Sequence, residues 1–281
     1  MLGLDKRAQE VYNNGMLAAR MPREKRLGSM KGLGWLVYKA VRGLARLFFH
    51  RPEFSGLENL PEGPCVLVGN HAQMYGPVLS EIYLPFDRAI WCTGEMMHLK
   101  EVPAYAFKDF WSSKPRRVRW LYRILSYIIA PISVGVFNNA HCIGVYHDSR
   151  IMTTFRQSLE KLSEGARVVI FPEHAVPHNN IVYDFQDRFL MLGRIYHRQT
   201  GERLAFVPMY FAPALGKVCF GEPVCYDPAA NPDAERRRVC DALMAGVTAL
   251  AEALPRHRVV PYLNLPKKEY PMSKPEGDAA P

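Results

Sequence analysis

The sequence lacks the cysteine spacing of a structural zinc site, and it lacks an apolar run long enough for an ordinary transmembrane helix. No two of its six cysteines form a C-x-x-C pair. A largely apolar stretch at residues 124–137 has only 14 residues and contains Pro131, whereas a spanning helix needs about 20. Internal repeats, low-complexity segments and the Gly-x-Ser-x-Gly elbow of serine hydrolases are also missing. These absences disfavour a zinc domain, a repeat architecture, an ordinary membrane span and that class of hydrolase.

The N-terminus lacks the apolar core and small-residue cleavage site of a signal peptide. We therefore expect a reducing, cytosolic compartment, in which the six cysteines are small buried hydrophobic residues rather than disulfide partners. His174 and His178 lie four positions apart, but no third ligand has matching spacing and Pro177 lies between them. We expect neither a metal site nor a bound cofactor.

Positive charge is in excess, but it is confined to two segments. The 281-residue chain has 36 Lys and Arg against 27 Asp and Glu, a net charge of +9. Residues 1–50 hold ten basic and three acidic residues, a balance of +7, and residues 108–123 hold six basic and one acidic, a balance of +5. The remainder is mildly acidic, at −3. Such patches suit a membrane surface, a nucleic acid or a phosphorylated substrate. Because no nucleic-acid module is recognisable, we do not expect nucleic acid as a partner.

Both basic segments are also amphipathic. Over residues 27–49, apolar side chains recur at helical spacing, with Lys and Arg on the other face. Residues 114–137 run from basic side chains into the apolar stretch, with Trp and Tyr at its edge as in membrane-interface anchors. Each segment alone also fits a helix packed on the protein body with its charged face in water. Together they favour peripheral, partly electrostatic attachment to anionic lipid on the cytoplasmic side of a membrane.

The body of the chain alternates short apolar strands with helical segments. We expect strands at 65–69, 89–92, 142–146, 167–171, 204–207 and 217–220, and helices near 76–84, 150–164, 184–200 and 233–253. This alternation predicts an α/β layered fold with one central sheet. We divide the chain into basic amphipathic membrane-associating helices (1–50), an α/β domain (51–265) and a solvated tail (266–281).

Polar residues follow two of these strands. Asn70 and His71 come after the first, and Phe171-Pro172-Glu173-His174 ends a later one. Ligands in open α/β sheets bind beyond the carboxyl ends of strands, and a neutral imidazole there suits a general base. The alternatives are a hydrogen-bonded structural histidine at a turn and a glutamate that caps the next segment.

Four short sequence blocks follow one another along the chain: Asn70-His71, Cys142 to Asp148, Val169 to Glu173, and Val207 to Tyr210. Spread over about half the chain, they resemble the glycerolipid acyltransferase family, which includes the lysophosphatidic acid acyltransferases. The resemblance implies a glycerol-3-phosphate acyltransferase-like α/β fold, with a single central, mostly parallel sheet flanked by helices and with N-terminal amphipathic helices. It also implies membrane association and transfer of an acyl chain from coenzyme A or acyl carrier protein to a hydroxyl group.

The chain departs from the family pattern at three places. The family has His, four residues, then Asp, whereas Gly76 stands at the Asp position here. The second block usually ends in Arg, where this chain has His147, and the third usually continues Gly, a hydroxyl residue and Arg, where it has His174-Ala175-Val176. Two expected phosphate-binding arginines are therefore missing, and Arg150 is a nearby candidate to substitute.

The resemblance implies a lysophospholipid acyltransferase-like O-acyltransferase with an unusual acceptor. His71 is the expected base, and Glu173 is expected to bind the acceptor or to replace the missing carboxylate. The co-substrates would be acyl-CoA or acyl carrier protein and a lysophospholipid or related lipid. The remaining residues expected to bind substrate are Asn70, Gln73, Tyr75, His147, Arg150, Phe171, Pro172 and His174. The alternative is a catalytically impaired or inactive family member that binds lipid or acyl carrier at the membrane surface.

Overall fold

The computed structural model describes residues 32–112, 114–174 and 180–275. The expectations for residues 1–31 and 276–281 therefore lie outside the described residues. The helices and strands of the described part are, in chain order, α2 (Leu33–Phe48), β1 (Glu53–Ser55), β2 (Cys65–Gly69), α3 (Tyr75–Tyr83), β3 (Arg88–Thr93), α4 (Val102–Ala106), α5 (Arg119–Phe137), β4 (Cys142–Val145), α6 (Ile151–Ser163), β5 (Arg167–Ile170), α7 (Met191–Thr200), β6 (Ala205–Ala212), β7 (Lys217–Phe220), β8 (Val224–Cys225) and α8 (Pro232–Ala253).

One eight-stranded sheet forms the centre of the molecule. Its strand order is β1-β7-β6-β2-β5-β3-β4, with β8 also paired to β6. β2 lies between β5 and β6 and is parallel to both, while β7 and β8 run antiparallel to β6. The expected α/β fold with a single central, mostly parallel sheet is therefore confirmed. The short strands β1 and β8 were not among the expected strands.

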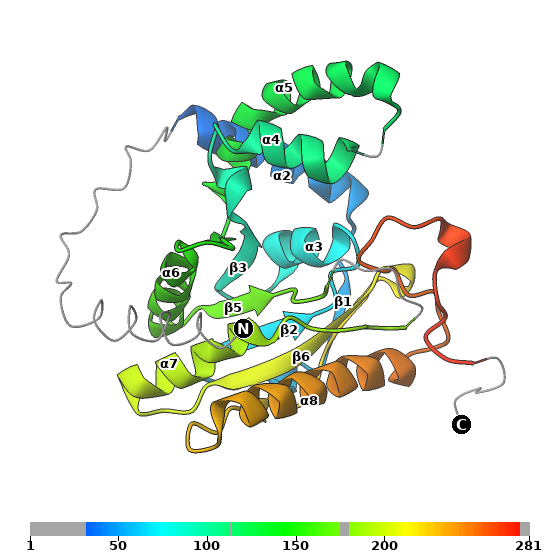
Figure 1. Cartoon of the computed structure of the whole chain (residues 1–281). Helices are drawn as coiled ribbons and strands as arrows, with labels where there is room; N and C mark the ends of the chain where they lie inside the picture. Colours follow the sequence, from blue (N-terminus) through cyan, green and yellow to red (C-terminus); the bar gives the residue numbers. More distant parts are fainter. Residues whose placement is uncertain (1–31, 113, 175–179, 276–281) are drawn as a thin grey trace. The chain divides into compact units, whose positions relative to one another are not determined.

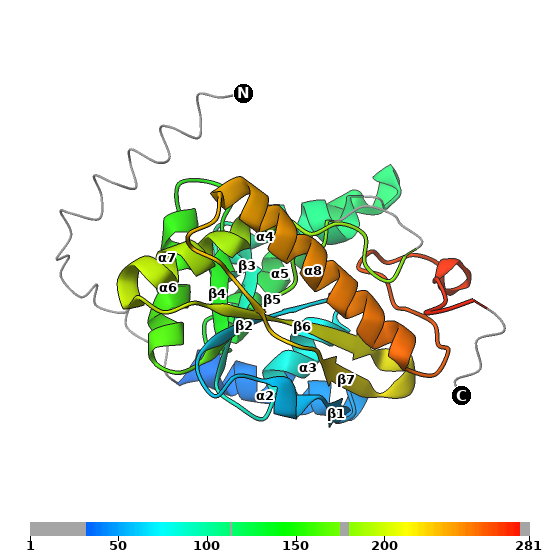
Figure 2. The ribbon, with the colours of Figure 1, turned by 90° about the horizontal axis from the view of Figure 1, so that it is seen from below.

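Helices cover both faces of this sheet. α3 lies on one face, while α7 and α8 lie on the other (Figures 1 and 2). The connection from β2 through α3 to β3 and the connection from β5 through α7 to β6 cross the sheet in opposite directions. Because such crossovers are almost always right-handed, opposite directions place the helices on opposite faces.

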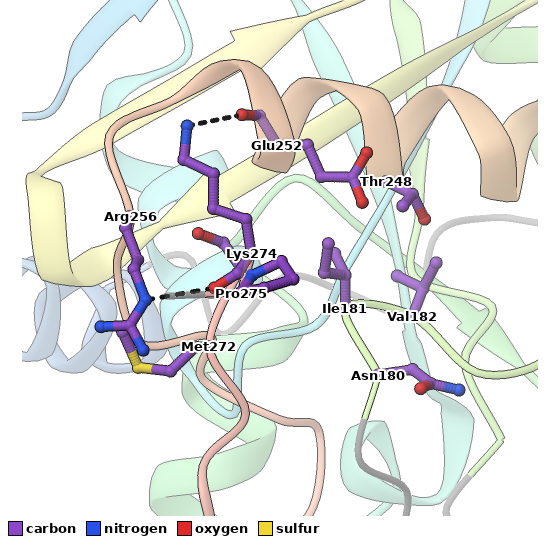
Figure 3. A pocket seen from close by; sticks show the side chains of 10 residues that line it. Asn180, Ile181, Val182, Thr248, Glu252, Arg256, Met272, Lys274 and Pro275 are labelled. Carbon is purple, nitrogen blue, oxygen red and sulfur yellow. Dashed lines mark hydrogen bonds between the residues drawn. The ribbon is translucent and has the colours of Figure 1, made fainter. Parts of the chain in front are cut away.

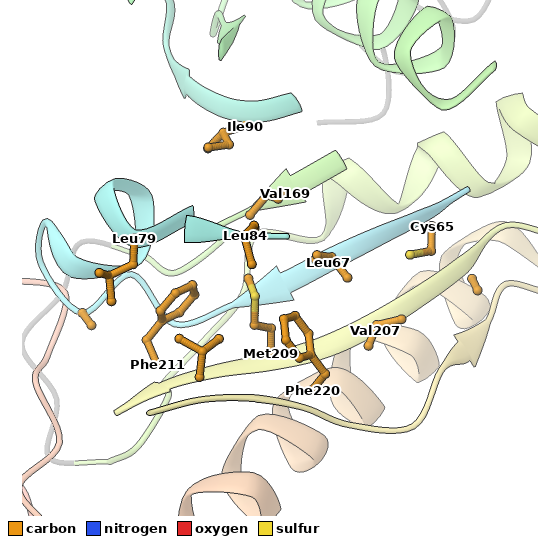
Figure 4. Close-up of a cluster of buried hydrophobic side chains, with 13 residues drawn as sticks. Cys65, Leu67, Leu79, Leu84, Ile90, Val169, Val207, Met209, Phe211 and Phe220 are labelled. Carbon is orange, nitrogen blue, oxygen red and sulfur yellow. The ribbon is translucent and has the colours of Figure 1, made fainter. Parts of the chain in front are cut away.

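The core follows from this two-sided cover. All five residues of β2 are buried, because a parallel strand with helices on both faces has no solvent side. Alternate side chains of the strand, Cys65 and Leu67, belong to the same apolar cluster as Leu79 of α3 (Figure 4). The carboxyl ends of β2 and β5 are thereby held side by side on a rigid support.

α2 contacts the rest of the protein mainly through Gly34, Val37 and Tyr38, and most of its apolar side chains face away from this contact. Its buried residues are Gly34 and Tyr38, and the Tyr38 hydroxyl donates a hydrogen bond to Glu81 of α3 at 2.6 Å. Its large apolar side chains are exposed, with Leu47 and Phe48 each 71% accessible. The helix is thus in contact with the body, but most of its apolar face is not buried there.

α5 is longer than the apolar stretch in the sequence because the residues before that stretch also join the helix. Together with the turn before it, the helix runs from Arg116 to Phe137 and has 22 residues. By length and composition alone it could cross a membrane, and only 17% of its most apolar 18-residue segment is buried in the structure. It crosses α2 closely, since a Cβ added at Gly135 would lie 3.5 Å from the Cα of Gly34. α2 and α5 therefore lie against each other, on the α3 side of the sheet (Figure 1).

Candidate active site

A strained turn follows β2 and carries His71. After Gly69 the chain passes through Ala72 and Gln73, whose φ angles are 46° and 54°, before α3 begins at Tyr75. This left-handed region is rarely occupied by residues other than glycine. The two consecutive left-handed residues turn the chain back, so that the backbone carbonyl of Gln73 reaches the ring of His71.

The His71 ring is held in one tautomer. Its Nδ1–H donates a hydrogen bond to the carbonyl oxygen of Gln73, and a carbonyl can only accept. The neutral ring therefore keeps a lone pair on Nε2. Phe171 meets the ring edge-on, with 5.4 Å between ring centroids, and Tyr262 packs on it at a tilt, with 4.5 Å between centroids. Burial lowers the pKa of His71 to about 4, although the hydrogen bond to Gln73 acts in the opposite direction.

Glu173 comes from the neighbouring strand and contacts the same turn. Its Oε1 accepts the backbone N–H of His71 at 2.5 Å, and its side chain is buried. Burial raises the pKa of Glu173 to about 7, although the hydrogen bond from His71 acts in the opposite direction. The two residues, 102 positions apart, are thus brought together. Glu173 holds the backbone of His71, whereas Gln73 holds the ring.

Gly76 has no room for the aspartate that the family pattern has there. A Cβ at Gly76 would lie 2.7 Å from the carbonyl oxygen of His71 and 2.7 Å from Cε1 of Phe171. Its φ lies outside the left-handed region, so the restriction is one of space and not of backbone angle. The tight turn thus explains the glycine.

Asn70, expected to contact substrate, has a structural role instead. It is buried, its Oδ1 accepts the N–H of Phe211 at 2.7 Å, and its Nδ2 donates to the carbonyl of Phe211 at 3.1 Å. The side chain fastens the end of β2 to β6 and is only 1% accessible. Phe171 packs between His71 and Phe211, and the Pro172 carbonyl accepts the N–H of Gln186 at 2.8 Å.

The structure does not bring His147 or Arg150 to this turn. Both follow β4, which is separated from β5 by β3 and so lies about 10 Å from β5. The guanidinium of Arg150 binds Asp148 and Glu101, each at 2.9 Å, so two carboxylates already compensate its charge. Arg150 therefore lies away from this turn, and its charge is already compensated there. His147 is exposed beside it.

His174 follows Glu173 but turns toward solvent. Its side chain is 45% accessible, and Nε2 lies 3.5 Å from Oδ2 of Asp184. Its backbone N–H donates to the Asp184 carbonyl at 3.1 Å, which fixes this direction. Of the two residues at the third-block strand end, Glu173 therefore faces the turn and His174 does not.

Part of the expected solvated tail packs against the site. Pro271 and Ser273 are buried, and Tyr270 accepts a hydrogen bond from Nε2 of Gln73 at 2.8 Å. The expectation of a solvated tail at residues 266–281 is therefore wrong for residues 270–274, whereas residues 266–269 and 275 are exposed. The buried His257 fastens this segment, because its Nε2 accepts the Tyr210 hydroxyl at 2.8 Å and its backbone N–H donates to Ser273.

Tyr262 and Tyr270 are the site residues that sequence reasoning missed. Both belong to a Pro- and Lys-rich segment with no helical or strand periodicity, so neither lies in a recognisable element. Two tyrosines within nine residues were the one available signal, because a solvated segment has little use for large aromatic side chains.

One cavity lies away from His71. It has a volume of about 520 Å³ and lies between the end of α8 and the C-terminal segment, where Lys274 donates to the Glu252 carbonyl and Arg256 to the Lys274 carbonyl (Figure 3). None of the site residues expected from the sequence lines it. Within the described ranges, no group of three or more His, Cys, Asp or Glu side chains could hold a metal ion.

Comparison with known proteins adds one distant similarity. No family model matches the sequence, and no curated protein matches it. The chain is similar to the crystal structure of the 1-acyl-sn-glycerophosphate (LPA) acyltransferase PlsC from Thermotoga maritima, with 19% sequence identity over 87% of this chain and 93% of that chain and a TM-score of 0.40. At this level of similarity the functional argument rests on the residues of the chain itself.

Proposed function

We propose that the chain is an O-acyltransferase that works at a membrane surface. It would move a fatty acyl group from an acyl thioester, acyl-CoA or acyl-acyl carrier protein, to a hydroxyl of a lysophospholipid or related lipid. The observation that carries this proposal is the geometry of His71, whose Nδ1–H is held by the Gln73 carbonyl so that Nε2 is an available base. The strained turn at the carboxyl end of β2 supports it, because such strain concentrates at functional sites.

In the proposed reaction, Nε2 of His71 takes the proton of the acceptor hydroxyl as its oxygen attacks the thioester carbonyl carbon. The C–S bond then breaks, the new ester forms, and the proton on His71 passes to the departing thiolate. Glu173 acts as a positioning residue, because its carboxylate fixes the backbone of the turn rather than the imidazole. Tyr262 shields the ring from water on one side.

Membrane attachment is supported by the exposed faces of α2 and α5. On α2, Leu44, Leu47 and Phe48 are more than half accessible, and on α5 Tyr127 is 70% and Ile128 59% accessible. Exposed apolar patches of this kind mark protein or membrane interfaces. Arg116, Arg117 and Arg119 at the start of α5 add positive charge suited to anionic lipid. This surface approaches the site, because Phe49 meets Tyr75 edge-on at 5.1 Å.

A specific observation favours a second candidate, a lipid- or acyl-carrier-binding protein without catalytic activity. The ring of His71 is held by a carbonyl, and a carbonyl does not stabilise the imidazolium of the transition state as a carboxylate does. A pKa of about 4 also makes His71 a weak base. Both candidate functions include binding to a membrane surface, and only the acyltransferase turns over an acyl thioester.

Thiol release separates the two candidates. The full chain is incubated with vesicles, acyl-CoA and a lysophospholipid, and free thiol and diacyl product are measured for wild type, His71→Ala and His197→Ala. His197 is half-buried on α7, on the opposite face of the sheet from α3, and serves as the control (Figure 1). An acyltransferase should lose about 10²–10⁴ in rate with His71→Ala, the usual scale of general-base assistance, and nothing with His197→Ala. Equal rates of thiol release for wild type and His71→Ala would reject His71 as the base and favour the non-catalytic binding protein.

A further inference from the structure

A second cavity, smaller than the one at the end of α8, lies directly beside the His71 turn. It has a volume of about 300 Å³, and Gln73 and Tyr75 form one wall. The C-terminal segment supplies the opposite wall through Arg258, Lys267 and Tyr270. Gln73 links the cavity to the candidate base, because its carbonyl holds the His71 ring while its side chain binds Tyr270.

The cavity carries uncompensated positive charge. Of its eight lining residues two are cationic and none is a carboxylate. Among the ion pairs of the described residues, none includes Arg258 or Lys267, in contrast to the doubly paired Arg150. A concave site with two free cations and no acid attracts an anion.

The backbone around Arg258 is well fixed, which preorganises its charge. Its neighbours His257 and Val259 are buried, and the Val259 N–H donates to the Pro271 carbonyl at 2.9 Å. Arg258 itself forms an antiparallel bridge with Met272. The guanidinium therefore extends from an anchored point toward solvent, where an anion would meet it without first ordering the chain.

The size of the cavity limits what it would hold. A volume of about 300 Å³ is at the low end for small-molecule sites. It suits a phosphate with a short polar linker and is too small for a complete acyl lipid. The acyl chain would therefore extend away from it, and Phe49 of the α2 side is already in contact with the cavity residue Tyr75.

From the cavity, its two unpaired cations and its place beside the His71 turn, we infer that Arg258 and Lys267 bind a phosphate ester of the substrate. This inference rests on the proposed acyl transfer for the identity of the substrate. It assigns to the C-terminal segment the charge that His147 and Val176 do not supply at the two expected arginine positions of this chain. Two substrates carry such a phosphate, the lysophospholipid acceptor and the coenzyme A donor.

Binding measurements on the full chain test this subsite without requiring turnover. The probes are glycerol 3-phosphate against glycerol for the acceptor, and coenzyme A against pantetheine for the donor. Wild type should bind at least one phosphate-bearing probe more tightly than its phosphate-free counterpart. Arg258→Gln with Lys267→Gln should weaken that binding about tenfold or more, because each cation makes a charge-assisted contact. The probe that responds names the source of the phosphate.

Matched variants separate this local effect from a change in overall charge or folding. Arg237→Gln with Lys268→Gln removes the same charge from exposed residues that do not line the cavity, and binding should be unchanged. Arg258→Lys should retain part of the affinity because it keeps the charge. Equal binding of the phosphate-bearing and phosphate-free probes, or wild-type affinity in the Arg258→Gln, Lys267→Gln variant, would overturn the subsite.

The same measurement on His71→Ala distinguishes this inference from the proposed function. Phosphate-dependent binding by both wild type and His71→Ala, together with equal thiol release by the two proteins, would keep the subsite and reject the enzyme. In an active enzyme, the double variant should raise the KM for the phosphate-bearing substrate about tenfold or more and change kcat little, as expected for a binding contact.

Discussion

The carboxylate of Glu173 binds the backbone N–H of His71, and the imidazole ring of that histidine is held by the carbonyl of Gln73. A buried carboxylate beside a histidine would ordinarily be expected to orient the ring. Here the two tasks are divided, since the carboxylate fixes the turn and a backbone carbonyl fixes the tautomer. Substitutions of Glu173 should therefore act first on the turn and on the pH dependence of stability.

Glu173→Gln should make the protein relatively more stable as pH rises. Because the pKa of Glu173 is about 7 when folded and near 4.5 when unfolded, the folded chain binds more protons between these values, and wild-type stability falls across that window. A shift of this size corresponds to about 3 kcal/mol. Because Gln cannot ionise, the free energy of unfolding of Glu173→Gln should rise relative to that of wild type by up to this amount between pH 4.5 and pH 7.5. Urea unfolding at both pH values measures it, and a pH-independent difference would contradict it.

Gly76→Ala should destabilise the protein by about 1–3 kcal/mol, the usual cost of overpacking. The added Cβ would meet the His71 carbonyl oxygen and the Phe171 ring at 2.7 Å. Gly76→Asp should do the same or worse and should not improve acyl transfer. Gly43→Ala is the matched control, because this α2 glycine has nothing within 4 Å of an added Cβ and should gain about 0.5–1 kcal/mol. Thermal unfolding of the pair measures both effects, and equal shifts would contradict the steric argument.

Asn70→Ala should cost about 2–5 kcal/mol, because it leaves both backbone polar groups of Phe211 without their buried partner. Asn70→Asp should also destabilise, since a carboxylate accepts the N–H but cannot donate to the carbonyl. Chemical denaturation measures the loss. A variant with wild-type stability and reduced substrate binding would instead restore the ligand role for this residue.

Tyr262→Ala should raise the pKa of His71 from about 4 toward its ordinary value near 6.5. Burial is the main cause of the low value, and Tyr262 is one of the two rings in contact with the imidazole. Tyr262→Phe keeps the ring and should leave the pKa close to that of wild type. The histidine ring resonances, followed by NMR through an acid titration, report it directly. An unchanged pKa in Tyr262→Ala would assign the burial to other residues.

Leu47→Glu with Ile128→Glu should weaken binding to vesicles, because both side chains are exposed on the apolar surface of α2 and α5. Leu57→Glu, an exposed leucine in the turn after β1, is the control and should bind like wild type. In flotation assays wild type should prefer anionic over neutral vesicles, and salt should reduce the preference, as attraction of about 1 kcal/mol per basic residue implies. Failure of wild type to float with either vesicle would reject membrane attachment.

Local pattern in the sequence predicted most of the fold. The buried runs at 65–69 and 167–171 became the adjacent strands β2 and β5, within one residue of the expected ends. A shared site for His71 and Glu173 was implied by the family resemblance, and it forms because the neighbouring parallel strands β2 and β5 bring their carboxyl ends to one edge of the sheet. Period and composition are properties of neighbouring residues, so a single chain is sufficient to read them.

Contacts between distant segments were decided by the tertiary structure alone. Which atom Glu173 binds, why Asn70 is unavailable to a ligand and why Arg150 is already paired all depend on partners far away in sequence or on turn geometry that no pattern encodes. The same holds for Tyr262 and Tyr270, whose segment lacks periodicity because it packs by individual side chains. The sequence by itself thus determined the sheet and the two strand ends, where hydrophobic periodicity governs folding. The tertiary structure decided the hydrogen-bond partners and the covering segment, because close packing joins residues whose spacing along the chain carries no signal.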